Sequence, residues 1–109
     1  MGQTRCQVEL TEAAWADLDE IDDYWTARGD AWRGEKYFYD LRDIALAELS
    51  DLQRARRGRF LKSDRHRKAR EILVFKGAYR IVYRIDETAR RVDILRFWHS
   101  HRDDPRGEV

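Results

Sequence analysis

The chain has 109 residues, of which 42% are hydrophobic and 39% are charged, and its formal net charge is +1. This length suits one domain with a modest core, so we expect a single domain over residues 1–109 with a flexible tail from about Asp103. The single cysteine, Cys6, excludes an internal disulfide framework, and no apolar run approaches the ~20 residues of a membrane span. We therefore expect a cytoplasmic protein with no membrane partner.

The small net charge hides a segregation along the chain. From Glu9 to Asp51, 13 acidic residues outnumber 4 basic ones, whereas from Arg54 to Arg70 there are 9 basic residues and one acid, Asp64. Such a bipolar molecule can present a basic face to a polyanion while it stays soluble. The basic stretch is compatible with a nucleic-acid contact, a solvated loop or a surface for a protein partner.

A helical hairpin is predicted in the first half of the chain, after a short strand over residues 5–10. Thr11 suits the N-cap of a first helix, Gly29 can end it in the left-handed conformation, and Asp30 can cap a second helix. The apolar stripes are Trp15, Leu18, Ile21 and Trp25 in the first helix, and Tyr37, Phe38, Leu41, Ile44, Ala45, Leu49 and Leu52 in the second. Neither stripe is stable alone in water, so we expect both to pack on a sheet.

Three strands are predicted in the second half, after a basic loop over residues 54–68. The first covers 69–75, and Lys76-Gly77 forms a two-residue hairpin turn into the second, over 78–86. In the second strand, odd positions from Tyr79 to Ile85 are apolar, whereas Arg80, Val82 and Arg84 face the other side. The predicted fold is α+β, with an N-terminal helical hairpin packed on a small twisted antiparallel sheet.

The last strand, from Arg91, is apolar on both faces. Strict alternation places Val92, Ile94 and Trp98 on one face and Leu95 and Phe97 on the other. A strand that is apolar on both faces is covered on both faces. The hairpin covers one of them, so the tail or a partner chain is expected to cover the other.

The sequence Tyr-Arg-Ile-Val-Tyr-Arg at 79–84, with Leu-Arg-Phe-Trp-His at 95–99, resembles the C-terminal signature of the RelE/ParE superfamily of bacterial toxins from toxin–antitoxin modules. The resemblance covers roughly residues 5–103 and includes the order of the helices and strands. It implies a toxin of a type II module that causes growth arrest and is neutralised by a cognate antitoxin. It also implies that the antitoxin wraps the toxin near Leu95, Phe97 and Trp98, and it implies no cofactor.

Two targets are open within this superfamily. ParE members act on DNA gyrase without hydrolytic chemistry, whereas RelE members are ribosome-dependent mRNA endoribonucleases. A binding module that has lost its toxicity is a third possibility. The candidate residues for binding a target or a phosphate are Arg70, Arg80, Arg84 and His99. Arginine offers a planar fork to phosphate, but Arg80 can equally pair with a carboxylate of this protein or of the antitoxin.

A nuclease would need an acid, a base and a group that stabilises the phosphorane. The resemblance assigns the phosphate contact to Arg80, and His99 can move a proton near neutral pH. The base is harder to find, because Glu71 has an uncertain orientation and His66 lies in the basic loop. Ser100 stands where the resemblance to ribosome-bound RelE members would place a tyrosine at the end of the strand. We therefore favour a ParE-like toxin over an endoribonuclease that uses Arg80, His99 and Glu71.

A metal site is not expected. His99, His101 and Asp103 share one face of the last strand by alternation, but no second cluster supplies the remaining ligands of a closed site.

Overall fold

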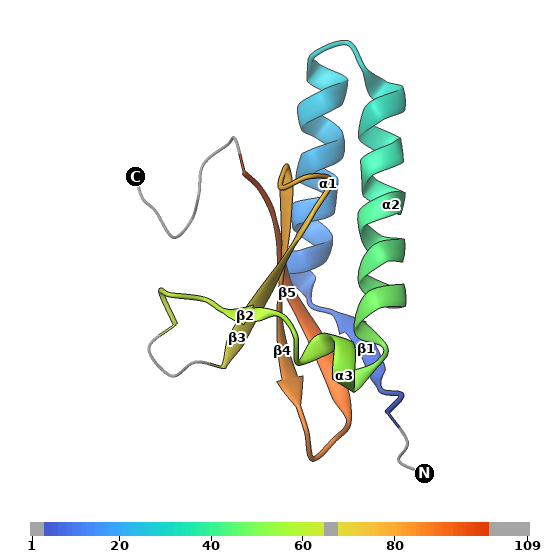
Figure 1. The fold of residues 1–109 in the computed structure, drawn as a ribbon. Helices are drawn as coiled ribbons and strands as arrows, with labels where there is room; N and C mark the ends of the chain where they lie inside the picture. The colour runs from blue at the N-terminus through green and yellow to red at the C-terminus, as the bar shows by residue number, and fades with distance from the viewer. Residues whose placement is uncertain (1–3, 65–67, 101–109) are drawn as a thin grey trace.

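The computed structural model describes residues 4–64 and 68–100. A helical hairpin stands against one face of a five-stranded sheet whose strand order is β1-β5-β4-β3-β2 (Figure 1). The α+β class is therefore confirmed. The tail from Asp103 and the side chains of His66 and His101 lie outside the described residues. The elements are β1 (Gln7–Leu10), α1 (Glu12–Ala27), α2 (Ala31–Leu49), α3 (Leu52–Ala55), β2 (Arg59–Phe60), β3 (Ala69–Val74), β4 (Tyr79–Asp86) and β5 (Arg91–His99).

The hairpin begins and turns where its capping residues predict. The Thr11 hydroxyl accepts from the Ala14 N–H, and the Asp30 carboxylate accepts from the Arg33 N–H at 3.0 Å. Gly29 has a φ of +81°, which only glycine adopts without strain. No described helix combines the length and the apolar content that crossing a bilayer requires.

The sheet is mixed, which corrects the prediction of a purely antiparallel one. β3, β4 and β5 pair antiparallel, as do β2 and β3, but β1 pairs parallel with β5 through Gln7↔Arg91 to Leu10↔Ile94. A tight turn forces antiparallel pairing only on strands that it joins directly. β1 and β5 are joined by the whole chain between them, so the sequence pattern does not fix their relative direction.

The β3–β4 turn is longer than predicted. Val74 pairs with Tyr79, so four residues form the loop, and three of them have positive φ: Phe75 (54°), Lys76 (55°) and Gly77 (87°). In a regular strand Phe75 would point away from the helices. In the left-handed conformation its ring instead packs against Tyr37 and Tyr79, with centroids 5.2 and 6.2 Å apart. These aromatic contacts offset the strain of a phenylalanine at positive φ.

The main core lies between the hairpin and the sheet. From the helices it contains Leu18, Leu41 and Ala45, each 0% exposed, and the β4 side chains Tyr79, Ile81 and Tyr83 complete it, as predicted. Trp15 departs from its predicted place, because Ala14 takes the core position and the indole remains 42% exposed.

A β-bulge changes the faces of the last strand. Val82 pairs with Arg96 but Tyr83 pairs with Ile94, so Leu95 is an extra residue in β5. A bulge interrupts the alternation of side chains. Phe97 therefore points into the hairpin core and is 2% exposed, while Trp98 packs with Leu95 on the opposite face. The predicted faces of Phe97 and Trp98 are thus wrong.

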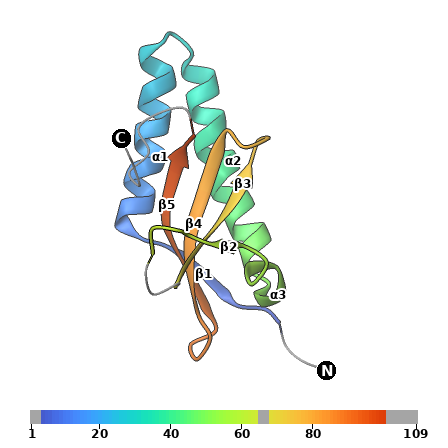
Figure 2. The same ribbon diagram turned by 60° about the vertical axis from the view of Figure 1, so that its left-hand side comes forward.

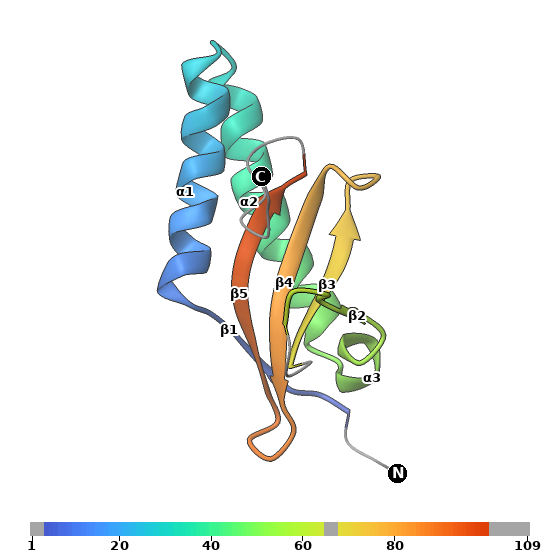
Figure 3. The ribbon, with the colours of Figure 1, turned by 90° about the vertical axis from the view of Figure 1, so that its left-hand side faces the viewer.

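The segment predicted as a basic loop contains α3 and β2, and it folds over the sheet. Figure 3 looks onto the face turned away from the hairpin, which we call the outer face, and shows β2 passing across it beside β3. Leu61, just after β2, is buried against Ala69 and Val82. The chain itself therefore covers part of the apolar outer face, which the sequence assigned to the tail or to a partner.

Candidate functional site

The outer face carries several of the predicted site residues. Two of its cross-strand rows are Arg59↔Glu71↔Val82↔Arg96 and Leu73↔Arg80↔Trp98. Because directly opposed side chains lie close together, guanidinium groups lie here beside apolar side chains and beside one carboxylate, Glu71. The apolar members Leu73, Val82 and Trp98 offer contact to a partner, whereas the arginines of these rows lie beside carboxylates of the protein itself.

Arg80 and Glu71 lie together on this face. Glu71 is 3% exposed, accepts a hydrogen bond from Arg59 Nε at 2.9 Å, and has a guanidinium nitrogen of Arg80 at 4.0 Å. A buried carboxylate needs such compensation. The geometry matches the interpretation in which Arg80 pairs with a carboxylate of the protein itself. The negative charge of Glu71 is opposed by two guanidinium groups of the same chain, the exposed one of Arg59 and the half-buried one of Arg80.

His99 lies on the opposite face of the sheet from Arg80. It pairs with Tyr79, whereas Arg80 pairs with Trp98, so the two side chains point to different sides of the sheet. The imidazole packs on Tyr79 with a centroid separation of 4.7 Å, and on Tyr24 of α1 at 5.5 Å. The structure therefore brings Arg80 and Glu71 together but does not bring His99 to them. His66, the other base considered, lies outside the described residues.

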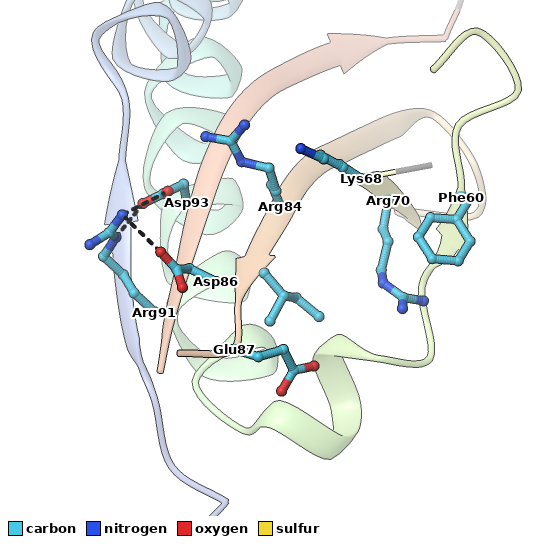
Figure 4. A pocket seen from close by; sticks show the side chains of 9 residues that line it. Phe60, Lys68, Arg70, Arg84, Asp86, Glu87, Arg91 and Asp93 are labelled. Carbon is cyan, nitrogen blue, oxygen red and sulfur yellow. Dashed lines mark hydrogen bonds and ion pairs between the residues drawn. The ribbon is translucent and has the colours of Figure 1, made fainter. Parts of the chain in front are cut away.

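Arg70 and Arg84 line a hollow where β3 begins and β4 ends (Figure 4). The hollow has a volume of about 450 Å³. One Arg70 nitrogen donates to the carbonyls of Arg56 and Gly58 at 2.9 and 2.8 Å, and its guanidinium lies 4.0 Å from the centre of the Phe60 ring. The lining residues are Phe60, Lys68, Arg70, Arg84, Ile85, Asp86, Glu87, Arg91 and Asp93.

The acids of this hollow are already paired. Glu87 accepts two hydrogen bonds from Arg56, which lower its pKa. Asp93 pairs with Arg91 at 2.9 Å. Within residues 4–64 and 68–100, Lys68 and Arg84 form no ion pair. Their positive charge is therefore available to an anionic group such as a phosphate or a carboxylate.

The three residues predicted to meet an antitoxin are divided between the two faces. Leu95 and Trp98 are half-buried on the outer face beside Val82, and Arg96 lies 5.9 Å from the Trp98 ring. Phe97 is buried under the hairpin. A partner on the outer face can reach Leu95 and Trp98 without unfolding the protein, but it cannot reach Phe97.

One important residue escaped the sequence analysis. Asp17 on α1 is 6% exposed and accepts two hydrogen bonds from Arg96, at 2.7 and 2.9 Å, and one from the Phe97 N–H at 2.9 Å. The hydrogen bonds from its guanidinium to Asp17 raise the pKa of Arg96. An acid at a helical step from Ala14 and Ile21 interrupts the buried stripe of α1, and that interruption was the available signal.

The chain is similar to known toxins. A family model described as the ParE toxin of the type II toxin–antitoxin system parDE matches residues 8–104. No curated protein matches the chain. A chain of the RelBE2 toxin–antitoxin complex from Mycobacterium tuberculosis is 23% identical with a TM-score of 0.68, over 93% of this chain and 98% of that one. A chain of the chromosomal ParDE toxin–antitoxin system from P. aeruginosa is 19% identical with a TM-score of 0.70, over 87% of this chain and 96% of that one.

Proposed function

The chain belongs to the ParE toxin family of type II toxin–antitoxin systems, and we propose that it arrests growth by binding DNA gyrase, with no hydrolytic step of its own. In this proposal it acts in the cytoplasm, needs no cofactor and is held inactive by a cognate antitoxin.

The observation that carries the choice of target is the separation of His99 from Arg80 and Glu71. Cleavage of RNA through the 2′-hydroxyl needs proton transfer and phosphate stabilisation around one phosphorus atom. Here the imidazole packs among Tyr24 and Tyr79 on the hairpin side, while the guanidinium lies on the outer face. Groups on opposite faces of a sheet do not act on one phosphate, so a binding mechanism is favoured over an acid–base mechanism.

The second candidate function is a ribosome-dependent mRNA endoribonuclease. The observation in its favour is the hollow of Figure 4, where Lys68 and Arg84 offer positive charge and Arg70 lies over the Phe60 ring. Cations beside an aromatic ring are common in sites for single-stranded nucleic acid. The same hollow also suits an acidic surface of a protein target, so it supports contact with either target.

The proposed antitoxin site is the outer face. Leu95 and Trp98 offer apolar contact there, and Arg84 can meet a carboxylate of an acidic segment. The solved RelBE2 and ParDE structures are toxin–antitoxin complexes of chains with this fold, which supports an antitoxin partner for this chain. Phe97 is excluded from the proposed contact because the hairpin buries it.

Two assays on the purified protein separate the candidates. In the first, gyrase supercoils a relaxed plasmid with and without the protein. In the second, ribosomes carry a message whose new 5′ ends are mapped. We expect inhibition of supercoiling and no new 5′ ends. Codon-positioned cuts without any effect on supercoiling would show that the target is mRNA and not gyrase. No effect in either assay would indicate a binding module without toxicity.

A further inference from the structure

The side of the hairpin turned away from the sheet carries a second surface, which none of the preceding functions uses. We call it the hairpin patch, and Figure 2 shows the two helices that form it lying side by side along their length. It combines one stripe of α1 with one stripe of α2. The patch consists of Trp15, Asp19, Asp22, Glu35, Phe38, Tyr39 and Leu46.

One end of the patch is apolar and exposed. Trp15 is 42% exposed, Tyr39 45% and Leu46 40%. The ring of Phe38 connects two of them, with centroids 6.4 Å from Trp15 and 5.2 Å from Tyr39, and Leu46 lies two helical turns after Tyr39 on α2. Large apolar side chains that are exposed singly need no explanation, but a contiguous group of them marks an interaction site.

The other end is acidic and hollow. A groove of about 450 Å³ is lined by Asp19, Asp22 and Glu35 and continues to Phe38 and Tyr39. The helices approach closely at its base, because a Cβ on Gly34 would lie 2.6 Å from the backbone oxygen of Asp22. The groove is therefore built into the crossing of the two helices.

These carboxylates have no cation to balance them. Among residues 4–64 and 68–100, none of Asp19, Asp22 and Glu35 forms an ion pair, and Asp22 accepts a hydrogen bond from the Thr26 hydroxyl at 3.3 Å. The nearby arginines pair with other acids, Arg33 with Asp30 and Arg42 with Asp43, and the Arg42 guanidinium also lies 4.9 Å from the centre of the Tyr39 ring at the apolar end of the patch. An apolar surface beside unpaired carboxylates is complementary to a segment that is both apolar and basic.

We propose that the hairpin patch binds a cationic amphipathic helix of a partner protein. Lysine or arginine side chains of that helix enter the groove toward Asp19 and Glu35, and its apolar side chains cover Trp15, Tyr39 and Leu46. A helix laid across two helices by its apolar stripe is a common mode of recognition. The partner differs from the acidic antitoxin segment proposed for the outer face, since the two surfaces have opposite charge and lie on opposite sides of the molecule.

A second copy of this chain is a poorer occupant. Its basic side chains lie mainly on the outer face and in the segment after α3, so the patch of one molecule would meet the sheet side of the next. Such a head-to-tail contact repeats without closing and produces filaments or large rings. A partner helix requires no such assembly.

The test uses two synthetic 18-residue peptides with the same amphipathic leucine pattern, one with lysine and one with glutamate at its polar positions. Fluorescence anisotropy measures their binding to the whole protein. We expect the lysine peptide to bind and the glutamate peptide not to bind. Asp19→Lys/Glu35→Lys should lower the affinity for the lysine peptide at least about tenfold, because the substitutions reverse both charges that contact it.

The matched control is Glu9→Lys/Glu48→Lys, which makes the same change in net charge at exposed positions outside the patch. This control should change affinity by less than about threefold, because exposed charges at a distance are screened by salt. Trp15→Ala/Tyr39→Ala, which keeps every charge, should also lower the affinity for the lysine peptide. Circular dichroism checks that all three variants are folded.

Three results would overturn the proposal. Equal losses in the patch variant and in the control variant would show attraction to net charge alone. Tighter binding of the glutamate peptide would show that the partner has the opposite charge. Concentration-dependent self-association that disappears in Trp15→Ala/Tyr39→Ala would assign the patch to a second copy of the chain. The result is independent of gyrase, because no target enters the assay.

Discussion

The carboxylate of Asp17, nearly buried on α1, receives both a bidentate guanidinium from Arg96 and the backbone N–H of the next residue in β5. The contact lies directly beside the bulge at Leu95. It ties the hairpin to the strand where the ladder is irregular. β1 pairs with β5 only from Arg91 to Ile94, so beyond Ile94 no described strand lies along that edge of β5, and Asp17 satisfies the Phe97 N–H.

Replacing Asp17 should therefore cost much more stability than its one charge suggests. Asp17→Ala leaves a guanidinium and a buried N–H without their acceptor, and we expect a loss of about 2–4 kcal/mol, below the full range for a buried pair because Arg96 is partly exposed. Urea unfolding at neutral pH measures it. Asp19→Ala, two residues away on the exposed side, is the control and should change stability by about 0.5 kcal/mol or less. If both substitutions changed the free energy of unfolding by the same small amount, the structural role assigned to Asp17 would be wrong.

Substitutions at Phe97 and Trp98 should have different effects, the first on stability and the second on partner binding. Phe97→Ala empties a core position under the hairpin and should cost about 3–5 kcal/mol in unfolding free energy. Trp98→Ala, on the outer face, should leave the protein folded. It should lower the affinity for the antitoxin by about 30-fold or more, as expected for a buried aromatic contact. Calorimetric titration with the cognate antitoxin measures the second effect. Unchanged antitoxin affinity in a folded Trp98→Ala protein would place the contact elsewhere.

Tyr83 links α3 to the sheet and gives a pH-dependent prediction. Its buried hydroxyl donates to the Ala55 carbonyl at 2.5 Å, and burial raises the pKa of Tyr83 to about 12. A folded pKa above the unfolded value of about 10 stabilises the protein below pH ~10, and this contribution disappears as the pH rises through about 12. The contribution is on the order of 2 kcal/mol.

Urea unfolding at pH 9 and pH 11.5 tests this prediction. The natural protein should lose more stability between the two pH values than Tyr83→Phe does, because the variant has no phenol to ionise at that position. Tyr39→Phe is the matched control, since Tyr39 is exposed, and it should behave like the natural protein. If Tyr83→Phe and Tyr39→Phe lost equal stability over this interval, the Tyr83 phenol would not be the responsible group.

The effect on stability of a substitution at Gly58 should depend on the side chain of Tyr83. A Cβ at position 58 would lie 1.8 Å from the Tyr83 hydroxyl oxygen and 2.8 Å from the ring carbon that carries it. Gly58→Ala should therefore destabilise the protein by about 2 kcal/mol or more, as overpacking typically does. Tyr83→Phe removes the nearer atom, so a double-mutant cycle should show coupling of at least about 0.5 kcal/mol. Additive effects would mean that the loop moves aside independently of the phenol.

The sequence predicted the parts of the fold that have local causes. Thr11, Gly29 and Asp30 define the hairpin through caps and a left-handed residue, and the alternation from Tyr79 predicts the core face of β4. The direction of β1 was not predictable, because no short turn connects it to β5. The faces of Phe97 and Trp98 were missed because the bulge at Leu95 leaves no mark on hydrophobic alternation.

The candidate site was predictable in composition but not in geometry. Arg80 and Glu71 are close in space because they occupy diagonal positions on adjacent strands of one face. His99 was grouped with Arg80 as a candidate for binding a target or a phosphate, yet register pairs it with Tyr79 and turns it toward α1. Residue types in a motif identify candidates, whereas register decides which face each side chain occupies.

The position of His99 leads to the last prediction, which concerns toxicity. His99→Ala removes an imidazole that packs on Tyr24 and Tyr79 and lies across the sheet from Arg80, so we expect growth arrest to persist. Lys68→Glu/Arg84→Glu reverses the unpaired charges of the hollow in Figure 4 and should weaken arrest strongly. Charge reversal at a contact commonly costs several kcal/mol, or more than about a hundredfold in affinity.

Growth of cells that express each variant at matched levels measures these effects, with the antitoxin withheld. Lys36→Glu, on the exposed side of α2 and paired with Asp40, is the control for a charge reversal far from the hollow and should retain full arrest. The same cells provide message for mapping new 5′ ends. Arrest that requires His99 and comes with codon-positioned cuts would mean that the imidazole reaches the phosphate after all, and would replace the gyrase proposal by a nuclease. Arrest that survives His99→Ala but fails when Lys68 and Arg84 are reversed is the outcome that a binding toxin requires.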